Sequence, residues 1–120
     1  MKQEELRQRL ISFAVNIIRF TKKLPKIEEN NIISKQIVRS STSIGANYSE
    51  AIYAHGKLDF IHCLVICRKE TNETIYWLDV LSALDSENKD VKYLKEEALT
   101  ILKIFVSSVK TARNNIKTTV

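Results

Sequence analysis

Apolar residues recur along this chain in alternating steps of three and four, a spacing that predicts four amphipathic helices. The predicted helices comprise about residues 3–24, 32–54, 59–84 and 90–117. Pro25 ends the first because proline cannot continue a helix, and Gly56 marks the turn after the second. The apolar stripe of the first helix consists of Leu6, Leu10, Phe13, Ile17, Phe20 and Leu24. That of the second consists of Ile33, Ile37, Ser41, Ile44, Tyr48 and Ala51.

The second predicted helix has small residues through its middle, where Ser40 to Ala51 reads SSTSIGANYSEA. Small side chains let another helix approach the backbone closely. A glycine inside a helix costs about 1 kcal/mol relative to alanine, so we expect a neighbouring helix to pass close to Gly45. This stretch is interpreted as a packing surface, because it lacks the layout of a catalytic centre.

Short connections between long amphipathic helices favour an all-α, antiparallel, up-down-up-down four-helix bundle. Residues 1–120 are expected to form one domain, because a chain of this length is long enough for a single hydrophobic core and too short for two. Two glycines and one proline are too few for the many turns of a β-sandwich. A three-helix core with a detached helix and a domain-swapped dimer are the alternatives.

If the second and third helices fold back about Gly56, two residues whose numbers add up to about 112 lie at the same height along the bundle. Arg39 then faces Glu73, and Glu50 faces His62. We interpret the polar residues of these helices as a buried network that fixes helix register or a subunit interface. An acid-base or metal centre is disfavoured because Glu-x-x-His pairs are absent. The candidate network is Arg39, Asn47, Glu50, Glu70, Glu73 and Trp77.

The chain is basic, with a net charge of +5. In an antiparallel bundle one pole collects the start of the first helix, the central turn and the end of the fourth helix. Basic surface attracts the phosphate backbone of nucleic acids, so this pole is the candidate nucleic-acid interface. Its cations are Lys2, Arg7, Arg9, Lys57, Lys110, Arg113 and Lys117.

The sequence offers little that indicates catalysis. Cys63 and Cys67 lie four apart on a predicted helix, where the geometry does not suit a disulfide, and we expect reduced, buried thiols. With His62 they supply too few ligands for a closed zinc site. Neither a Gly-rich phosphate loop nor an H-E-x-x-H motif is present. We therefore expect no enzymatic activity, no catalytic residue, no metal and no cofactor.

Localisation is also predicted from what the sequence lacks. No segment holds eighteen apolar residues without charge, and Met1 to Glu5 does not have the pattern of a secretory signal. We expect a cytoplasmic protein.

Several of these positions together resemble a known family. They are Gln36, Arg39, SIGANYSEA at 43–51, Asp59 with Phe60, and KETNETIYWL at 69–78. The chain resembles, over essentially its whole length, the four-helix-bundle proteins encoded within intervening sequences of large-subunit ribosomal RNA genes, often labelled ribosomal or intervening-sequence proteins. The resemblance implies a ring, typically a homopentamer, without catalytic activity. The chain is also similar to the accessory protein of diversity-generating retroelements, a basic pentamer that binds nucleic acid and a reverse transcriptase.

Two hypotheses of function follow. The first is a non-enzymatic homo-oligomer, a pentameric ring, that binds RNA or DNA through basic surface repeated around the ring. The second is a protein-interaction scaffold that recruits a partner protein, such as a reverse transcriptase, without nucleic-acid binding.

Overall fold

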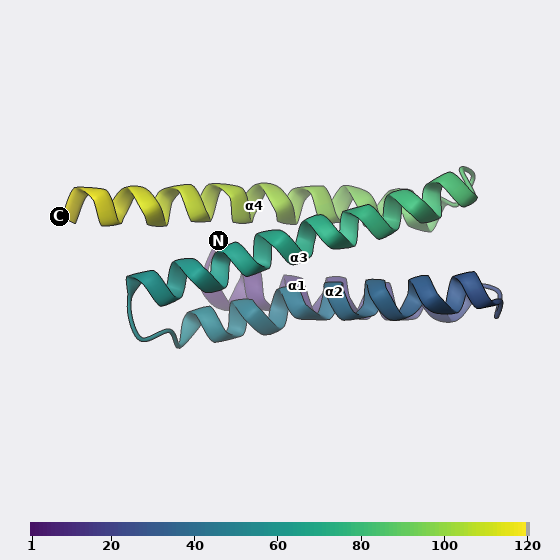
Figure 1. The fold of residues 1–120 in the computed structure, drawn as a ribbon, viewed down its shortest axis with the longest axis horizontal. Helices are drawn as coiled ribbons and strands as arrows, with labels where there is room; N and C mark the ends of the chain where they lie inside the picture. The colour runs from purple at the N-terminus through teal and green to yellow at the C-terminus, as the bar shows by residue number, and fades with distance from the viewer. Residues whose placement is uncertain (120) are drawn as a thin grey trace.

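A computed structural model of the chain describes the backbone of residues 1–119 and the side chains of residues 1–116. It contains four helices that run alternately up and down and form an elongated bundle of 53 × 22 × 22 Å (Figure 1). The predicted all-α, antiparallel four-helix bundle is confirmed. The helices are α1 (Gln3–Lys23), α2 (Glu28–Ile52), α3 (Lys57–Leu84) and α4 (Lys89–Thr119).

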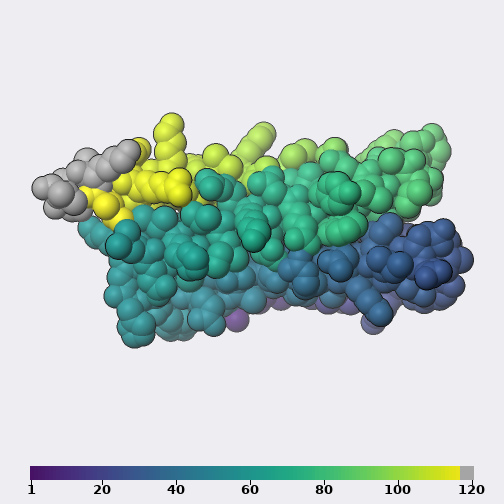
Figure 2. All heavy atoms as spheres, viewed as in Figure 1, coloured from purple at the N-terminus to yellow at the C-terminus, as the bar shows by residue number. Residues whose placement is uncertain are grey.

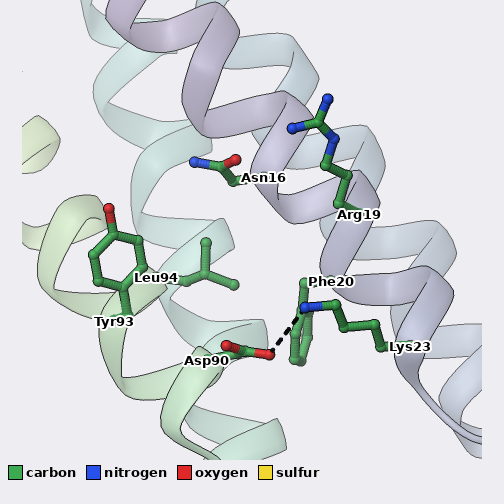
Figure 3. A pocket seen from close by; sticks show the side chains of 7 residues that line it. All are labelled: Asn16, Arg19, Phe20, Lys23, Asp90, Tyr93 and Leu94. Atoms are coloured by element: carbon green, nitrogen blue, oxygen red, sulfur yellow. Dashed lines mark ion pairs between the residues drawn. The ribbon is translucent and has the colours of Figure 1, made fainter.

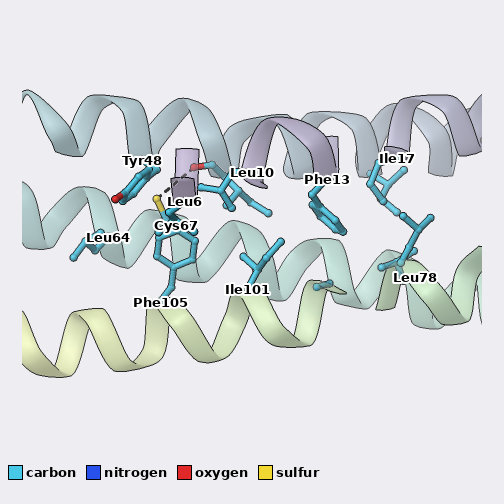
Figure 4. Packing of buried hydrophobic residues seen from close by; sticks show 14 of the residues in the cluster. Leu6, Leu10, Phe13, Ile17, Tyr48, Leu64, Cys67, Leu78, Ile101 and Phe105 are labelled. Carbon is cyan, nitrogen blue, oxygen red and sulfur yellow. Dashed lines mark hydrogen bonds between the residues drawn. The ribbon is translucent and has the colours of Figure 1, made fainter. Parts of the chain in front are cut away.

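The core consists of the apolar stripes that the sequence predicts. The stripe of α2 is buried throughout, and that of α1 is buried except for Leu24, which is partly covered. Figure 4 shows side chains from all four helices meeting between them, among them Phe13, Ile17 and Phe105. Burial of each large apolar side chain stabilises the fold by about 1.5–3 kcal/mol. Within the described part of the chain, no helix is long and apolar enough to span a membrane.

The helices differ in length, and this leaves one edge of the bundle open. α1 has 21 residues and α4 has 31, which at 1.5 Å per residue makes α1 shorter by about 15 Å. The α1–α2 and α3–α4 turns lie at the same end, so α1 begins well short of the end of α4 (Figure 1). The last turns of α4 therefore have no α1 beside them, and the α1–α4 pair makes the least contact of the four neighbouring pairs.

The small residues of α2 allow close approach on two sides. Ser40 and Ser41 are fully buried, and the Ser40 side chain meets Thr74 of α3. A Cβ atom placed on Gly45 would lie 3.4 Å from the Leu10 Cβ of α1. The expected close neighbour of Gly45 is thus α1, while Ser40 contacts α3.

The turns are tighter than predicted. α2 begins at Glu28 and not near residue 32, and α3 begins at Lys57 and not near residue 59. The side chain of Ile27, the N-cap of α2, forms no capping hydrogen bond. Two glutamates in the first turn instead favour the helix start through its dipole. The Asn30 side-chain amide also donates to the Pro25 carbonyl at 3.0 Å, which ties the first turn of α2 to the loop.

Candidate functional site

The first candidate site is the α2–α3 seam, where four predicted network residues meet. The Arg39 Nη1 atom donates to the Glu70 Oε2 atom at 2.8 Å, and Arg39 Nη2 donates to Glu73 Oε2. The Trp77 Nε1 atom donates to the same Glu73 oxygen at 3.2 Å. Glu70 is buried, whereas about half of the Arg39 side chain is exposed. The predicted pairing of Arg39 with Glu73 is confirmed.

Beneath this ion-pair network lies a buried row of smaller polar contacts. The Ser40 and Thr74 hydroxyl oxygens are 2.8 Å apart, and Thr74 donates to the Glu70 carbonyl at 2.9 Å. The Cys67 thiol donates to the Ile44 carbonyl at 3.4 Å. The residue pairs joined across the seam have positions that sum to about 112, so the predicted register is correct.

The remaining network candidates do not join this cluster. The Asn47 side-chain amide donates to the Ser43 carbonyl of its own helix at 2.8 Å. Glu50 and His62 are both exposed, and no hydrogen bond or ion pair between them is found among the described residues. The predicted Glu50–His62 pairing is wrong, because near the turn both side chains lie in solvent, where such pairs gain little.

The electrostatics of the network are those of a stable ion pair. Burial alone would raise the pKa of Glu73, but hydrogen bonds from Arg39 and Trp77 and the nearby charges of Arg39 and Lys69 lower it overall. The hydrogen bonds with Glu73 and Glu70 raise the pKa of Arg39. Both groups are therefore charged at neutral pH. A carboxylate held in this state is suited to fixing helices rather than to exchanging protons.

The two cysteines are free and buried, as predicted. Burial raises the pKa of Cys67 to about 12, and burial followed by the charges of Asp59 and Glu50 raises the pKa of Cys63. Because only the thiolate is a strong nucleophile or metal ligand, neither group is activated for such chemistry near neutral pH.

The second candidate site is the α1–α4 seam, which two ion pairs bridge. The Arg9 Nε and Nη2 atoms donate to the two Glu97 carboxylate oxygens at 2.8 and 2.7 Å. The Lys23 Nζ atom lies 3.7 Å from Asp90 Oδ2. Between these bridges is a cleft of about 320 Å³, in which Figure 3 shows Asn16 of α1 opposite Tyr93 of α4. A groove of about 700 Å³ lies beyond Arg9, beside the free end of α4.

In the structure, the cations predicted to form one basic pole fall into two groups, those held by partners within the bundle and those exposed on its surface. Arg9 is held by Glu97, and the Arg7 Nε atom donates to the Ser49 hydroxyl of α2 at 3.1 Å. Arg7 and Arg9 thus point toward different helices and already have partners within the bundle. Lys2 and Lys57 are exposed at the starts of α1 and α3, whereas Lys110 and Arg113 are exposed on the part of α4 that extends past α1. The side chain of Lys117 lies outside the described residues.

A line of cations on α4 was missed by the sequence reasoning. Lys103, Lys110 and Arg113 follow at steps of seven and three, so they share one side of the helix over about 15 Å. All three are exposed, and none forms an ion pair with another described residue. The signal was present in the sequence: residues 98–120 contain four cations and no Asp or Glu. Figure 2 shows this end of α4, in yellow, projecting along the upper edge of the molecule.

Comparison with known proteins identifies relatives. The model of the 23S rRNA-intervening sequence protein family matches residues 2–107. A similar solved structure is a protein of unknown function from the S23 ribosomal protein family of Bacteroides thetaiotaomicron. It is 37% identical, the match covers 92% of this chain and 99% of that chain, and the TM-score is 0.82. No curated protein matches. The family match ends before Lys110 and Arg113, so these cations lie outside the region that defines the family.

Proposed function

The chain belongs to the family of 23S rRNA-intervening sequence proteins, and from this premise we propose that it is a non-enzymatic, cytoplasmic homo-oligomer that binds nucleic acid. The observation that carries the proposal is the line of exposed cations on α4, namely Lys103, Lys110 and Arg113, which form no ion pair with another described residue. No acidic residue follows Glu97 along the chain, so the charge of this side of α4 is not neutralised locally. The same reasoning excludes Arg9 from the interface, since its guanidinium is occupied.

A line of cations suits a phosphate backbone better than it suits a single small anion. Each cation that neutralises a phosphate releases a condensed counterion, which favours binding. Three such contacts per chain bind weakly, but copies arranged in a ring bind together through their high effective concentration. Oligomerisation is therefore part of the proposed binding mechanism.

We propose a homopentameric ring as the assembled form. The bundle exposes large apolar side chains near both of its ends, and exposed apolar surface of this kind marks contacts with other proteins. Tyr53 and Leu58 are 82% and 76% exposed beside the α2–α3 turn. Size exclusion with light scattering should give about five times the mass of one chain at micromolar concentration. A monomer under these conditions would contradict the ring.

The nucleic-acid proposal is tested by charge reversal on α4. A fluorescein-labelled single-stranded RNA is titrated with the wild type, and we expect log K to fall with log salt with a slope of at least about −2, from three phosphates per chain. The variant Lys103→Glu, Lys110→Glu, Arg113→Glu should lose this binding. A matched control with the same total charge reverses three exposed lysines that form no ion pair in the described structure: Lys22, Lys26 and Lys35.

The two variants separate a localised interface from general attraction. The control should bind RNA within about threefold of the wild type, since its substitutions lie at the opposite end of the bundle. If both variants lose binding equally, only net charge matters and the α4 interface is wrong. If the wild type does not bind at low salt, nucleic-acid binding is wrong altogether.

The second candidate function is a protein-interaction scaffold, and the groove beside α4 favours it. In this case a partner protein binds the bundle, and the basic charge is incidental. Association with a partner protein that persists at moderate salt and in the absence of nucleic acid would support the scaffold over nucleic-acid binding.

A further inference from the structure

The groove beside the free end of α4 occupies the place where a longer α1 would pack. Its volume of about 700 Å³ is within the range of pockets that bind ligands. Leu6, Tyr48, Phe60 and Leu64 supply apolar surface from three helices. Polar side chains including Gln3 line it as well. The groove is therefore an apolar channel with polar edges, built by all four helices.

The α4 wall of the groove has the spacing of a helix-packing seam. Thr100, Ile104, Ser108, Ala112 and Asn115 recur in steps of four and three and all line the groove. They span about 22 Å, the length of four helical turns. Ser108 and Ala112 are only half-buried, whereas the neighbouring Val109 is buried in the core. Their small side chains leave room for another helix at close range.

Tyr48 brings one polar atom to the groove. Its side chain is only 7% exposed, and its ring packs edge-on against Phe105 at 6.0 Å. Its hydroxyl forms no hydrogen bond with any described residue, and Figure 4 shows it pointing away from Leu10 and Phe13. No buried side-chain oxygen or nitrogen of the described residues lacks a hydrogen-bond partner, so this hydroxyl still reaches solvent in the groove. An occupant that covers it must offer a polar atom in place of water.

The charge around the groove points to an acidic occupant. Lys103 is the only charged side chain among the described residues that line it. The α4 wall comes from the segment after Glu97, which has cations but no acidic residues. Such a wall complements an acidic helix, and not the end of α4 of a second copy, which carries cations and no acidic residue.

We propose that this groove receives an amphipathic α-helix of a partner protein, about four turns long, with its apolar side on Tyr48 and Leu64 and acidic residues beside Lys103. This inference deepens the scaffold function by giving its partner a chemistry and a binding site. It does not depend on nucleic-acid binding: of the cations proposed to bind phosphates, Lys103 lines the groove, whereas Lys110 and Arg113 are not among its lining residues.

The test uses two labelled 18-residue peptides that form amphipathic helices, both with leucine at heptad positions a and d. One carries glutamate and alanine at the other positions, and the second carries lysine in place of glutamate. In fluorescence anisotropy at physiological salt, the acidic peptide should bind the full chain saturably, at least tenfold more tightly than the basic one. Ser108→Trp, which fills the groove, should weaken acidic-peptide binding at least tenfold. Ser12→Trp, on an exposed position of α1, should leave it unchanged.

Each other outcome counts against the proposal. It is overturned if the acidic peptide does not bind saturably, if both peptides bind equally, or if Ser108→Trp binds as the wild type does. If light scattering shows that Ser108→Trp dissociates the homo-oligomer, a second copy fills the groove and the partner helix is wrong. RNA binding by Ser108→Trp should stay at the wild-type level, so failure here is distinguishable from failure of the nucleic-acid proposal.

The role of Tyr48 is tested by a double-mutant cycle. The acidic peptide is compared with a version in which glutamine replaces the central leucine, and each is titrated against the wild type and Tyr48→Phe. A hydrogen bond between the glutamine and the hydroxyl should give a coupling of about three- to tenfold in affinity. Coupling below about twofold overturns the assignment of Tyr48 as the polar contact.

Discussion

The α2–α3 and α1–α4 seams join helices of the same bundle but are built differently. Across α2–α3, Ser40 and Thr74 bring the helices close, and their buried hydroxyls and the Glu70 carboxylate find partners within the seam. Across α1–α4, two ion pairs span a cleft, and the described part of α4 extends past the start of α1 beside an open groove. The comparison indicates that the α2–α3 seam fixes the fold, whereas the α1–α4 edge remains available for binding.

The largest difference between the seams should appear when a serine is enlarged. Ser40→Leu places three extra carbons where the helices are in contact, and we expect it to lower the free energy of unfolding by about 1–3 kcal/mol or more. Ser108→Leu makes the same change beside the open groove and should alter stability by less than about 0.5 kcal/mol. Urea denaturation of both variants measures the contrast. Equal losses would mean that the two seams are packed alike.

Removing one arginine from each seam should give a smaller contrast. Arg39→Ala leaves the buried Glu70 carboxylate without its charged donor and should cost about 1–3 kcal/mol. Arg9→Ala breaks a pair in which both side chains remain partly in solvent, and should cost less than about 1 kcal/mol. The same denaturation measurement checks both values. A larger loss for Arg9→Ala would show that α1–α4 is the seam that holds the bundle together.

The smallest effect concerns pH. Because the folded state lowers the pKa of Glu73, this group stabilises the protein above its ordinary pKa of 4.5. That stabilisation is lost as the pH falls through the lower folded value. Carbon-13 NMR titration of the Glu73 carboxyl should therefore give a midpoint below 4.5 in the wild type. In Arg39→Ala the midpoint should rise, since burial remains and a donor is gone. A wild-type midpoint at or above 4.5 would contradict the ion-pair network.

The sequence was sufficient to predict the part of the fold that depends on local periodicity. It predicted the four helices and, from the turn at Gly56, the pairing of Arg39 with Glu73. The same register wrongly predicted a pairing of Glu50 with His62. Residues at the same height on two helices interact only where burial holds their side chains together. The sequence could not predict that Arg9 pairs with Glu97, because no turn joins the first helix to the fourth and fixes their register. That register depends on the different lengths of α1 and α4, which also create the groove.

The candidate surface was only half predictable for the same reason. Lys110 and Arg113 were chosen by their place at one pole, and they are indeed exposed on α4. Arg7 and Arg9 were grouped with them, yet both have intramolecular partners that only the packed structure reveals. Lys103 was not predicted, because it lies near the middle of α4 and not at the basic pole.

Native-state hydrogen exchange tests the contrast between the seams most directly. Backbone amides are followed in each helix under conditions where the protein is a single species by light scattering. If α2–α3 is the closed seam and α1–α4 the open edge, amides around Ser40 and Thr74 should exchange most slowly, through global unfolding. Amides of α1 and of α4 beyond Ile104 should exchange through smaller openings. Exchange in α1 as slow as in α2 and α3 would contradict this account.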